Sequence, residues 1–242
     1  MVLTVAVIAT AGNVPTLAAK AATATIPIVF GVGDDPIRLG LVASFARPGG
    51  NLTGINFFNA ELTAKRLRLL HDLVPKASRV AVLLNPANAS STESQLRIVQ
   101  EAAPTIGLQI QILNATTIGE IDAAFATLER GRPDALFVAG DAFFVSRAVQ
   151  FATLTARSRI PATYAGRDFV AVGGLMSYGT DFTEAFRQVG VYTGKILKGA
   201  KPVELPVVQS TKFEFVINMQ TARALGLEVP AQLLATVDDV IE

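Results

Sequence analysis

The acidic side chains that could bind a ligand follow apolar, strand-like runs. Asp34 and Asp35 come after the run Ile26–Phe30 and a glycine-rich turn, and Asp141 comes after the run Ala135–Val138. In open α/β sheets, ligands bind at the carboxyl ends of the strands. The three carboxylates are therefore candidates to bind an ammonium or another cationic group.

Neutral hydrogen-bonding groups and one cation occupy comparable loops. Arg167 could pair with a carboxylate, and the backbone N–H groups at helix starts could bind an anion. Apolar walls could come from Phe57, Phe58, Phe143 and Tyr178. The neutral polar candidates are Thr10, Asn13, Asn85, Asn88 and Ser90. This mixture fits a small zwitterion or polar organic solute better than a reaction mechanism.

Most of these candidates also have a purely structural interpretation. Asp34 and Asp35, which precede Pro36, could cap a helix, and Asn85 and Asn88 could be turn residues. Ser90 or Ser91 could cap the helix that follows.

The aromatic and basic candidates have alternatives too. Phe143 and Phe144 could both belong to the core, although adjacent residues usually face different ways. Arg167 and Asp168 could form a surface ion pair, and the segment Tyr178–Asp181 could be a strand end followed by a helix N-cap.

Signals for catalysis, metals and cofactors are weak. The sequence contains no GxSxG, HExxH, GxxxxGK[ST] or GxGxxG motif. The sequence has one histidine, His71, which does not support a histidine metal site or a Ser-His-Asp triad. It has no cysteine, which excludes a thiolate metal site. We predict no metal, no cofactor and no catalytic residue.

The elements that must position these side chains alternate between strands and helices. Strand-like runs are Val2–Ala9, Ile26–Phe30, Val80–Leu84, Leu108–Leu113, Ala135–Val138 and Leu175–Tyr178. Helix-period segments are Pro15–Ala22, Ala60–Leu73, Ser91–Ile106, Ile118–Arg130, Ser146–Ser158 and Phe182–Leu197. This order predicts an α/β fold with parallel sheets. Pattern alone leaves two options, two lobes or a single doubly wound sheet.

Composition is that of a packed α/β protein. Hydrophobic residues make up 50% of the 242 residues, charged residues make up 17%, and the mean hydropathy is +0.43. The net charge is +1 and the sequence has no long basic block, so it does not indicate a basic surface that would bind nucleic acid. No apolar run approaches the roughly 18 residues that suggest a membrane span.

Several long blocks resemble one protein family nearly end to end. They include IPIVFGVGDDPIRLGLVASFARPGGNLTGINFF, AKRLRLLHDLVP, VAVLLNPAN, GGLMSYG and KFEFVINMQTARALGLEVPAQLLATVDDVIE. The chain is identified as a member of the ABC-transporter substrate-binding proteins of the tryptophan/tyrosine-type group, with the type I periplasmic-binding-protein fold.

The resemblance implies two Rossmann-like lobes joined by a multi-strand hinge. The first lobe would comprise 1–56 and 175–205, and the second 57–174 and 206–242. A small solute would bind in the cleft between them and be presented to a membrane permease, without catalysis. Periplasmic or cell-envelope lipoprotein location is implied, although this sequence carries no signal peptide.

Carried over by position, the resemblance assigns roles to the candidate residues. Thr10 to Asn13 and the Asp34-Asp35 pair would line the first lobe's side of the cleft. In members that bind aromatic amino acids, the loop resembling Asn85–Ser90 holds the carboxylate and an aspartate resembling Asp141 holds the amino group. Here that loop reads NPANASS, rather than a serine-rich version.

The chain departs from the family at its start. Family members carry a signal peptide and a β-α-β-α segment before the strand that resembles Val5–Thr10. We therefore expect an N-terminally truncated first lobe with exposed apolar faces, which a second copy of the chain would cover in a homodimer.

Two other functions remain as alternatives. The same fold serves as the ligand-sensing module of receptors and repressors. An isomerase or racemase would need two opposed acid/base groups, and the sequence offers carboxylates without an obvious partner.

Overall fold

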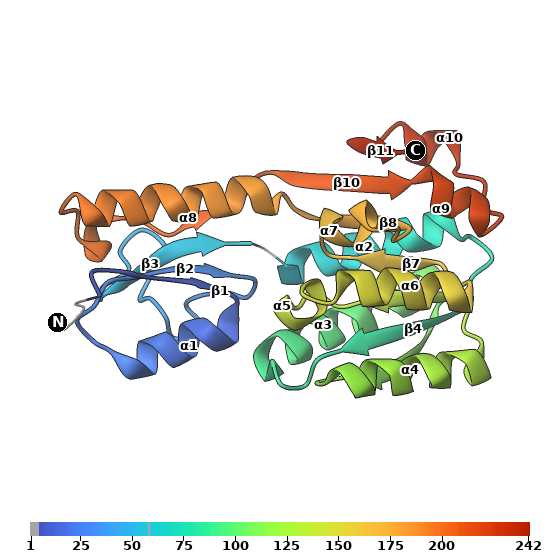
Figure 1. Cartoon of the computed structure of the whole chain (residues 1–242), viewed down its shortest axis with the longest axis horizontal. Coiled ribbons are helices and arrows are strands. Elements are labelled where there is room, and N and C mark those ends of the chain that lie inside the picture. Colours follow the sequence, from blue (N-terminus) through green and yellow to red (C-terminus); the bar gives the residue numbers. More distant parts are fainter. Residues whose placement is uncertain (1–4, 58) are drawn as a thin grey trace. The chain divides into compact units, whose positions relative to one another are not determined.

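The computed structural model describes residues 5–57 and 59–242. The chain divides into two compact units (Figure 1). Unit 1 comprises Met1–Phe58 with Thr180–Lys212, and unit 2 comprises Asn59–Gly179 with Phe213–Glu242. Each unit is built around its own sheet, which excludes the single doubly wound sheet.

Unit 1 contains a parallel sheet with strand order β1-β2-β3-β9. Every residue of the two central strands is buried, as expected when both faces of a parallel sheet are covered. The strands are β1 (Ile8–Ala11), β2 (Ile28–Val32), β3 (Leu52–Asn56) and β9 (Val208–Gln209).

Helices lie on both faces of this sheet (Figure 1). α8 (Phe182–Leu197) packs on β2 and β3 through an apolar stripe that includes Ala185, Val189 and Tyr192. On the opposite face, α1 (Asn13–Ala22) packs on β1 and β2. A short 3-10 helix, η2 (Pro202–Glu204), precedes β9.

Unit 2 contains a larger sheet with strand order β11-β10-β8-β7-β6-β4-β5. β4 lies beside β6, and their parallel pairing brings the carboxyl ends of both strands to one edge. The strands are β4 (Arg79–Leu84), β5 (Gln109–Asn114), β6 (Ala135–Val138), β7 (Ala162–Tyr164), β8 (Met176–Thr180), β10 (Phe213–Asn218) and β11 (Asp239–Ile241).

The helices of unit 2 form two layers that enclose separate apolar clusters. α2, α3, α9 and α10 contribute to the cluster on one face, and α4, α5, α6 and α7 to the cluster on the other. Their bounds are α2 (Asn59–Leu73), α3 (Ala89–Ala102), η1 (Ala103–Ile106), α4 (Ile118–Gly131), α5 (Ala142–Val145), α6 (Ala148–Ser158), α7 (Arg167–Ala171), α9 (Met219–Ala224) and α10 (Ala231–Leu234).

The predicted α/β class with parallel sheets is confirmed, and two local predictions are wrong. No helix follows Pro36, because the next residues form consecutive turns in which Asp35 accepts the amide hydrogens of Ile37 and Arg38. The N-cap of α3 is Asn88, and Ser90 and Ser91 lie inside its first turn.

The boundaries between the units differ from the predicted ones by a few residues. Residues 175–179 lie in unit 2, because β8 pairs with β7. Residues 206–212 lie in unit 1, because β9 pairs with β3, and Phe57 belongs to unit 1 as well. In both cases strand pairing decides the boundary.

β1 forms one edge of the unit 1 sheet. The apolar side chains of Val5, which precedes β1, and of Val14 and Leu17 in α1 are exposed. The homodimer that would cover such a surface stays a prediction. Among the described residues, none of the helices has the length and apolarity needed to cross a membrane.

Gly54 permits a close approach between β2 and β3, so Gly54→Ala is expected to destabilise unit 1. A Cβ atom there would lie 2.7 Å from the Phe30 backbone nitrogen, and overpacking of this kind costs about 1–3 kcal/mol. Chemical denaturation measures the change.

Gly190→Ala, in α8, is the matched control. A Cβ at Gly190 meets no atom within 4 Å, so this change should stabilise the helix by about 0.5–1 kcal/mol. Equal effects of the two substitutions would contradict the close approach at Gly54.

Candidate functional site

The candidate site in unit 2 lies where β4 and β6 end side by side. Asn85 follows β4 directly, and Asp141 follows β6 after two residues. Asn85 Nδ2 donates to Asp141 Oδ1 over 2.8 Å, and Asn88 Nδ2 donates to Asp141 Oδ2 over 3.0 Å. The strand order thus joins residues more than fifty positions apart into one polar cluster.

Asp141 keeps one acceptor position for a further donor. Its Oδ1 also accepts the Phe143 amide hydrogen at 3.0 Å, which makes Asp141 the N-cap of α5. A carboxylate offers about four lone-pair positions, and these three bonds leave one on Oδ2. A half-buried carboxylate held in this way suits an ammonium group.

Gln95 fixes the loop that carries Asp141. Its Oε1 accepts the Gly140 amide hydrogen at 2.8 Å, and its Nε2 donates to the Gly140 carbonyl at 3.1 Å. The same Nε2 also donates to Ser91 Oγ over 2.8 Å. Sequence reasoning missed Gln95, although a glutamine four residues before the buried Val99 already falls on the apolar face of the helix.

The predicted neutral donors in this loop have partners of their own. Asn85 Oδ1 accepts the Ala87 amide hydrogen at 3.1 Å, so the turn interpretation applies to one end of that side chain. The Nδ2 groups of Asn85 and Asn88 are directed at Asp141. Ser90 is exposed in the first turn of α3.

The aromatic candidates in unit 2 are mostly core residues. Phe144 is fully buried, whereas Phe143 is half-buried two positions from Asp141, with the Arg147 guanidinium 5.7 Å from its ring centre. Tyr178 is buried against Phe215, and Lys65 Nζ lies 4.4 Å from the centre of its ring. Phe143 is therefore the aromatic candidate beside the cluster.

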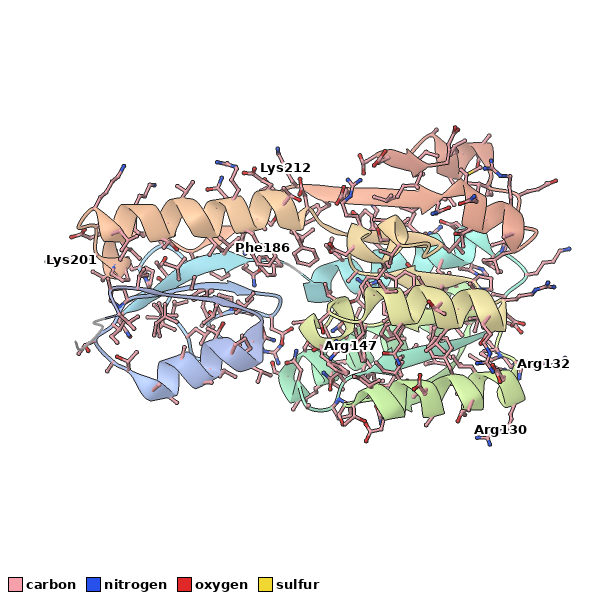
Figure 2. All side chains as sticks on the ribbon, in the orientation of Figure 1. Arg130, Arg132, Arg147, Phe186, Lys201 and Lys212 are labelled. Carbon is pink, nitrogen blue, oxygen red and sulfur yellow. The ribbon has the colours of Figure 1, made fainter. Side chains whose placement is uncertain are left out.

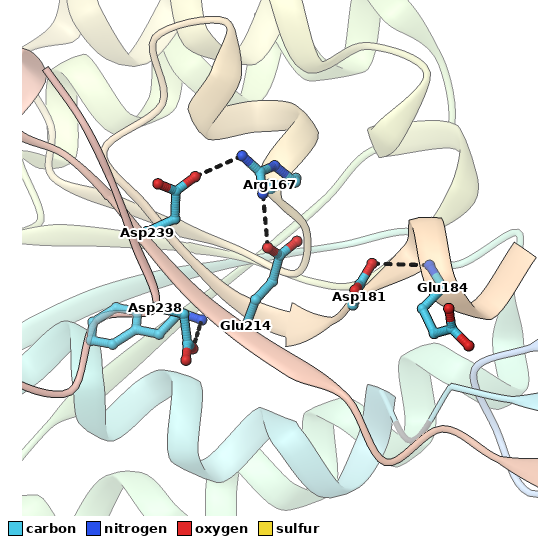
Figure 3. Close-up of polar contacts among 7 residues, drawn as sticks. Arg167, Asp181, Glu184, Glu214, Asp238 and Asp239 are labelled. Atoms are coloured by element: carbon cyan, nitrogen blue, oxygen red, sulfur yellow. Dashed lines mark hydrogen bonds and ion pairs between the residues drawn. The ribbon is translucent and has the colours of Figure 1, made fainter. Parts of the chain in front are cut away.

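Arg167 has a different environment from the predicted one (Figure 3). It bonds Glu214 over 3.0 Å and Asp239 over 2.8 Å, rather than Asp168. The hydrogen bond to Asp239 and the charge of Glu214 raise the pKa of Arg167. Its charge tethers α7 to β10 and β11, so we assign it a structural role.

The candidate residues in unit 1 gather at the carboxyl ends of β1, β2 and β3. Asn13 Nδ2 donates to Asp34 Oδ2 over 2.7 Å, and Asn56 Nδ2 donates to the Asp34 carbonyl over 2.6 Å. All three side chains are buried. Asn56 was not among the predicted residues, although it is the last residue of β3 and so lies at a strand end, as Asp34 lies just beyond the end of β2.

Thr10 and Asp35 make local contacts. The Thr10 and Thr16 hydroxyls lie 2.8 Å apart, and Thr16 donates to the Gly12 carbonyl over 2.7 Å. Asp35 caps the turn after β2, so its carboxylate stabilises the backbone.

An aromatic group forms part of unit 1. The ring of Phe57 packs edge-on against Phe182 and Phe186, with centroids 5.3 and 5.6 Å away. Phe57 is buried, whereas Phe186, which is labelled in Figure 2, has a relative exposure of 45%. Phe58, the remaining aromatic candidate, lies outside the described residues.

A groove of about 530 Å³ lies at the amino ends of β7 and β8, away from the polar cluster. Thr155, Gly173 and Thr221 are among its lining residues, which come from α6, the approach to β8 and α9. It contains none of the predicted polar cluster. Among the described residues, no group of three or more His, Cys, Asp or Glu side chains could hold a metal ion.

The sequence from residue 4 to 241 matches the family model described as ABC transporter substrate binding protein. The chain belongs to this family. Sequence comparison also finds the tyrosine-binding protein of Clostridioides difficile (strain R20291), which is 28% identical over 211 residues. That alignment covers 87% of this chain but only 60% of the relative, so the chain spans about three fifths of its length.

Solved structures of similar proteins support the same relationship. The ABC domain from Streptococcus pneumonia, crystallised in complex with L-Trp, has 25% identity and a TM-score of 0.86, covering 98% of this chain and 79% of that one. A ligand-free, open substrate binding protein with adhesive properties from Clostridium difficile has 27% identity and a TM-score of 0.64, covering 98% and 78%. The predicted type I periplasmic-binding-protein fold is confirmed.

Gln95→Leu is expected to destabilise the chain by about 1–3 kcal/mol, because it leaves the buried N–H and C=O groups of Gly140 without partners. Urea denaturation measures the loss. The control is Gln100→Leu on the exposed side of α3, for which we expect a change within about 0.5 kcal/mol. Similar values for both variants would show that the Gly140 bonds contribute little.

Proposed function

We propose that the chain binds an aromatic amino-acid-like solute for an ABC importer and that the ammonium group of the solute binds Asp141. The observation that carries this proposal is the remaining acceptor position on a carboxylate held by Asn85 and Asn88. The names of two relatives, a tyrosine-binding protein and a domain complexed with L-Trp, support the solute class.

The chemistry of the cluster favours binding over turnover. Three hydrogen bonds hold Asp141 in one orientation, and the isomerase or racemase alternative would need a second acid/base group opposite it. No histidine or cysteine belongs to the cluster, since His71 is on α2 and cysteine is absent. We infer that the protein is not an enzyme.

The other parts of the proposal follow from the family. An importer's binding protein delivers its solute to a membrane permease, which would be the protein partner of this chain, and it works outside the cytoplasmic membrane. Phe143 beside Asp141 is our candidate to contact the aromatic ring of the solute. The buried Asn13–Asp34–Asn56 cluster at the strand ends of unit 1 is a separate candidate for polar contacts with the solute.

Calorimetric titration with L-tyrosine and L-tryptophan tests the proposal. Asp141→Asn should weaken binding of the preferred amino acid about 10- to 100-fold, because a hydrogen bond between charged groups contributes roughly 1.5–3 kcal/mol. Asp122→Asn, at an exposed aspartate on α4, should leave the affinity unchanged.

An analogue without the amino group provides a further control. 3-(Indol-3-yl)propanoate should lose no affinity in Asp141→Asn, since it carries no ammonium for Asp141 to bind. Equal tryptophan binding by wild type and Asp141→Asn would remove Asp141 from the site. Chemical conversion of the solute after prolonged incubation would contradict a pure binding function.

A further inference from the structure

Arg66 is a fully buried charged residue in unit 2. Its side chain is 0% exposed within α2, and Nε and both terminal nitrogens have no hydrogen-bond partner among the described residues. Burial lowers the pKa of its guanidinium to about 9, so the group is still charged at neutral pH. A buried charge without a counter-charge or hydrogen bonds is strongly unfavourable.

The described contact of this charge is with an aromatic ring. The central carbon of the guanidinium lies 4.5 Å from the centre of the Phe137 ring. An aromatic ring attracts a cation, but it does not provide the oxygen or halide acceptors that five N–H donors require. The described acidic residue of α2, Asp72, is exposed and forms no ion pair with Arg66.

Thr163 places a second unpaired polar group beside Phe137. Thr163 on β7 is the register partner of Phe137 on β6, and register partners on neighbouring parallel strands share one face of a sheet. α2 packs on both strands. Thr163 is 0% exposed and its Oγ1 has no hydrogen-bond partner among the described residues. The Arg66 guanidinium and the Thr163 hydroxyl, two unpaired donor groups, therefore both lie between α2 and the sheet.

The Arg66 guanidinium lies over β6, close to the carboxyl end of that strand. Side chains on a helix lean toward its N-terminus. Phe137, beneath the guanidinium, is the third residue of the four-residue strand β6, and Asp141 follows three residues after that strand ends. Asn85 and Asn88, the predicted donors for an anionic group, are directed at Asp141.

We propose that Arg66 and Thr163 form a binding site for a small monovalent anion, buried beneath α2 against β6 and β7. The anion supplies both the negative charge and the acceptors that the guanidinium and the threonine hydroxyl need. Two sources share this chemistry. One is a halide from solution, and the other is the carboxylate of the amino-acid solute, which rests on the proposed function.

Thermal unfolding in increasing sodium chloride, against a background of a large sulfonate anion, tests the site. An anion that binds only the folded chain raises the unfolding temperature of the wild type until the site is saturated. Arg66→Met should remove this saturable rise and unfold at the same or a higher temperature than wild type without chloride, because it removes a buried charge. Arg68→Met, at an exposed position of α2, should respond like wild type.

The wild type alone provides an independent measurement if Arg66→Met fails to fold. Anomalous diffraction from crystals soaked in bromide should locate the ion against the Arg66 guanidinium. Water would satisfy the donors without a charge, so neither a saturable halide response nor a bromide peak would then appear. That result, together with tryptophan binding that is indifferent to chloride, would overturn the proposal.

Titration with L-tryptophan distinguishes the two sources. If the solute carboxylate occupies the site, chloride should weaken tryptophan binding at least tenfold near saturation, and Arg66→Met should weaken it similarly. If the site takes halide alone, the stability response persists while tryptophan affinity is unaffected by chloride. A chain that binds no tryptophan but still shows the halide response would contradict the proposed function and leave the anion site standing.

Discussion

The parallel pairing of β4 with β6 is the constraint on which the candidate site depends. It places the loops after both strands at one edge, where Asn85 and Asn88 can bond both oxygens of Asp141. Gln95 on α3 then holds the loop that carries Asp141, because its side chain bonds both the N–H and the C=O group of Gly140. The carboxylate is thus oriented before any ligand arrives, which reduces the entropy that binding must offset.

Charge recognition in this unit is divided between two different environments. Asp141 is half-buried and bonded to neutral amide donors, and the described residues form no ion pair with it, so it can receive a cation. Arg66 is fully buried, and its described surroundings provide an aromatic ring but no acceptor. An amphoteric solute and an inorganic anion would both find a complementary charge in unit 2. By contrast, Arg167 is neutralised by Glu214 and Asp239 and serves the fold.

The sequence predicted the elements better than the roles of their side chains. Apolar runs such as Ala135–Val138 are strands because their hydrophobicity is continuous, and the loops after them carry the polar residues. The strand order, which makes Asn85 a neighbour of Asp141, is a long-range property that local pattern does not contain. Gln95 and Arg66 were missed because a polar residue on a helix is read as exposed until the packing is known. The predicted helix after Pro36 is replaced by a turn, because the Asp35 carboxylate accepts the Ile37 amide hydrogen.

A crystal structure of the chain with bound L-tryptophan tests the central claim most directly. Our prediction is an ammonium nitrogen at hydrogen-bonding distance from Asp141 Oδ2, with Asn85 and Asn88 still bonded to the carboxylate. A bound tryptophan whose ammonium group contacts other residues, while Asp141 keeps only its present partners, would contradict it.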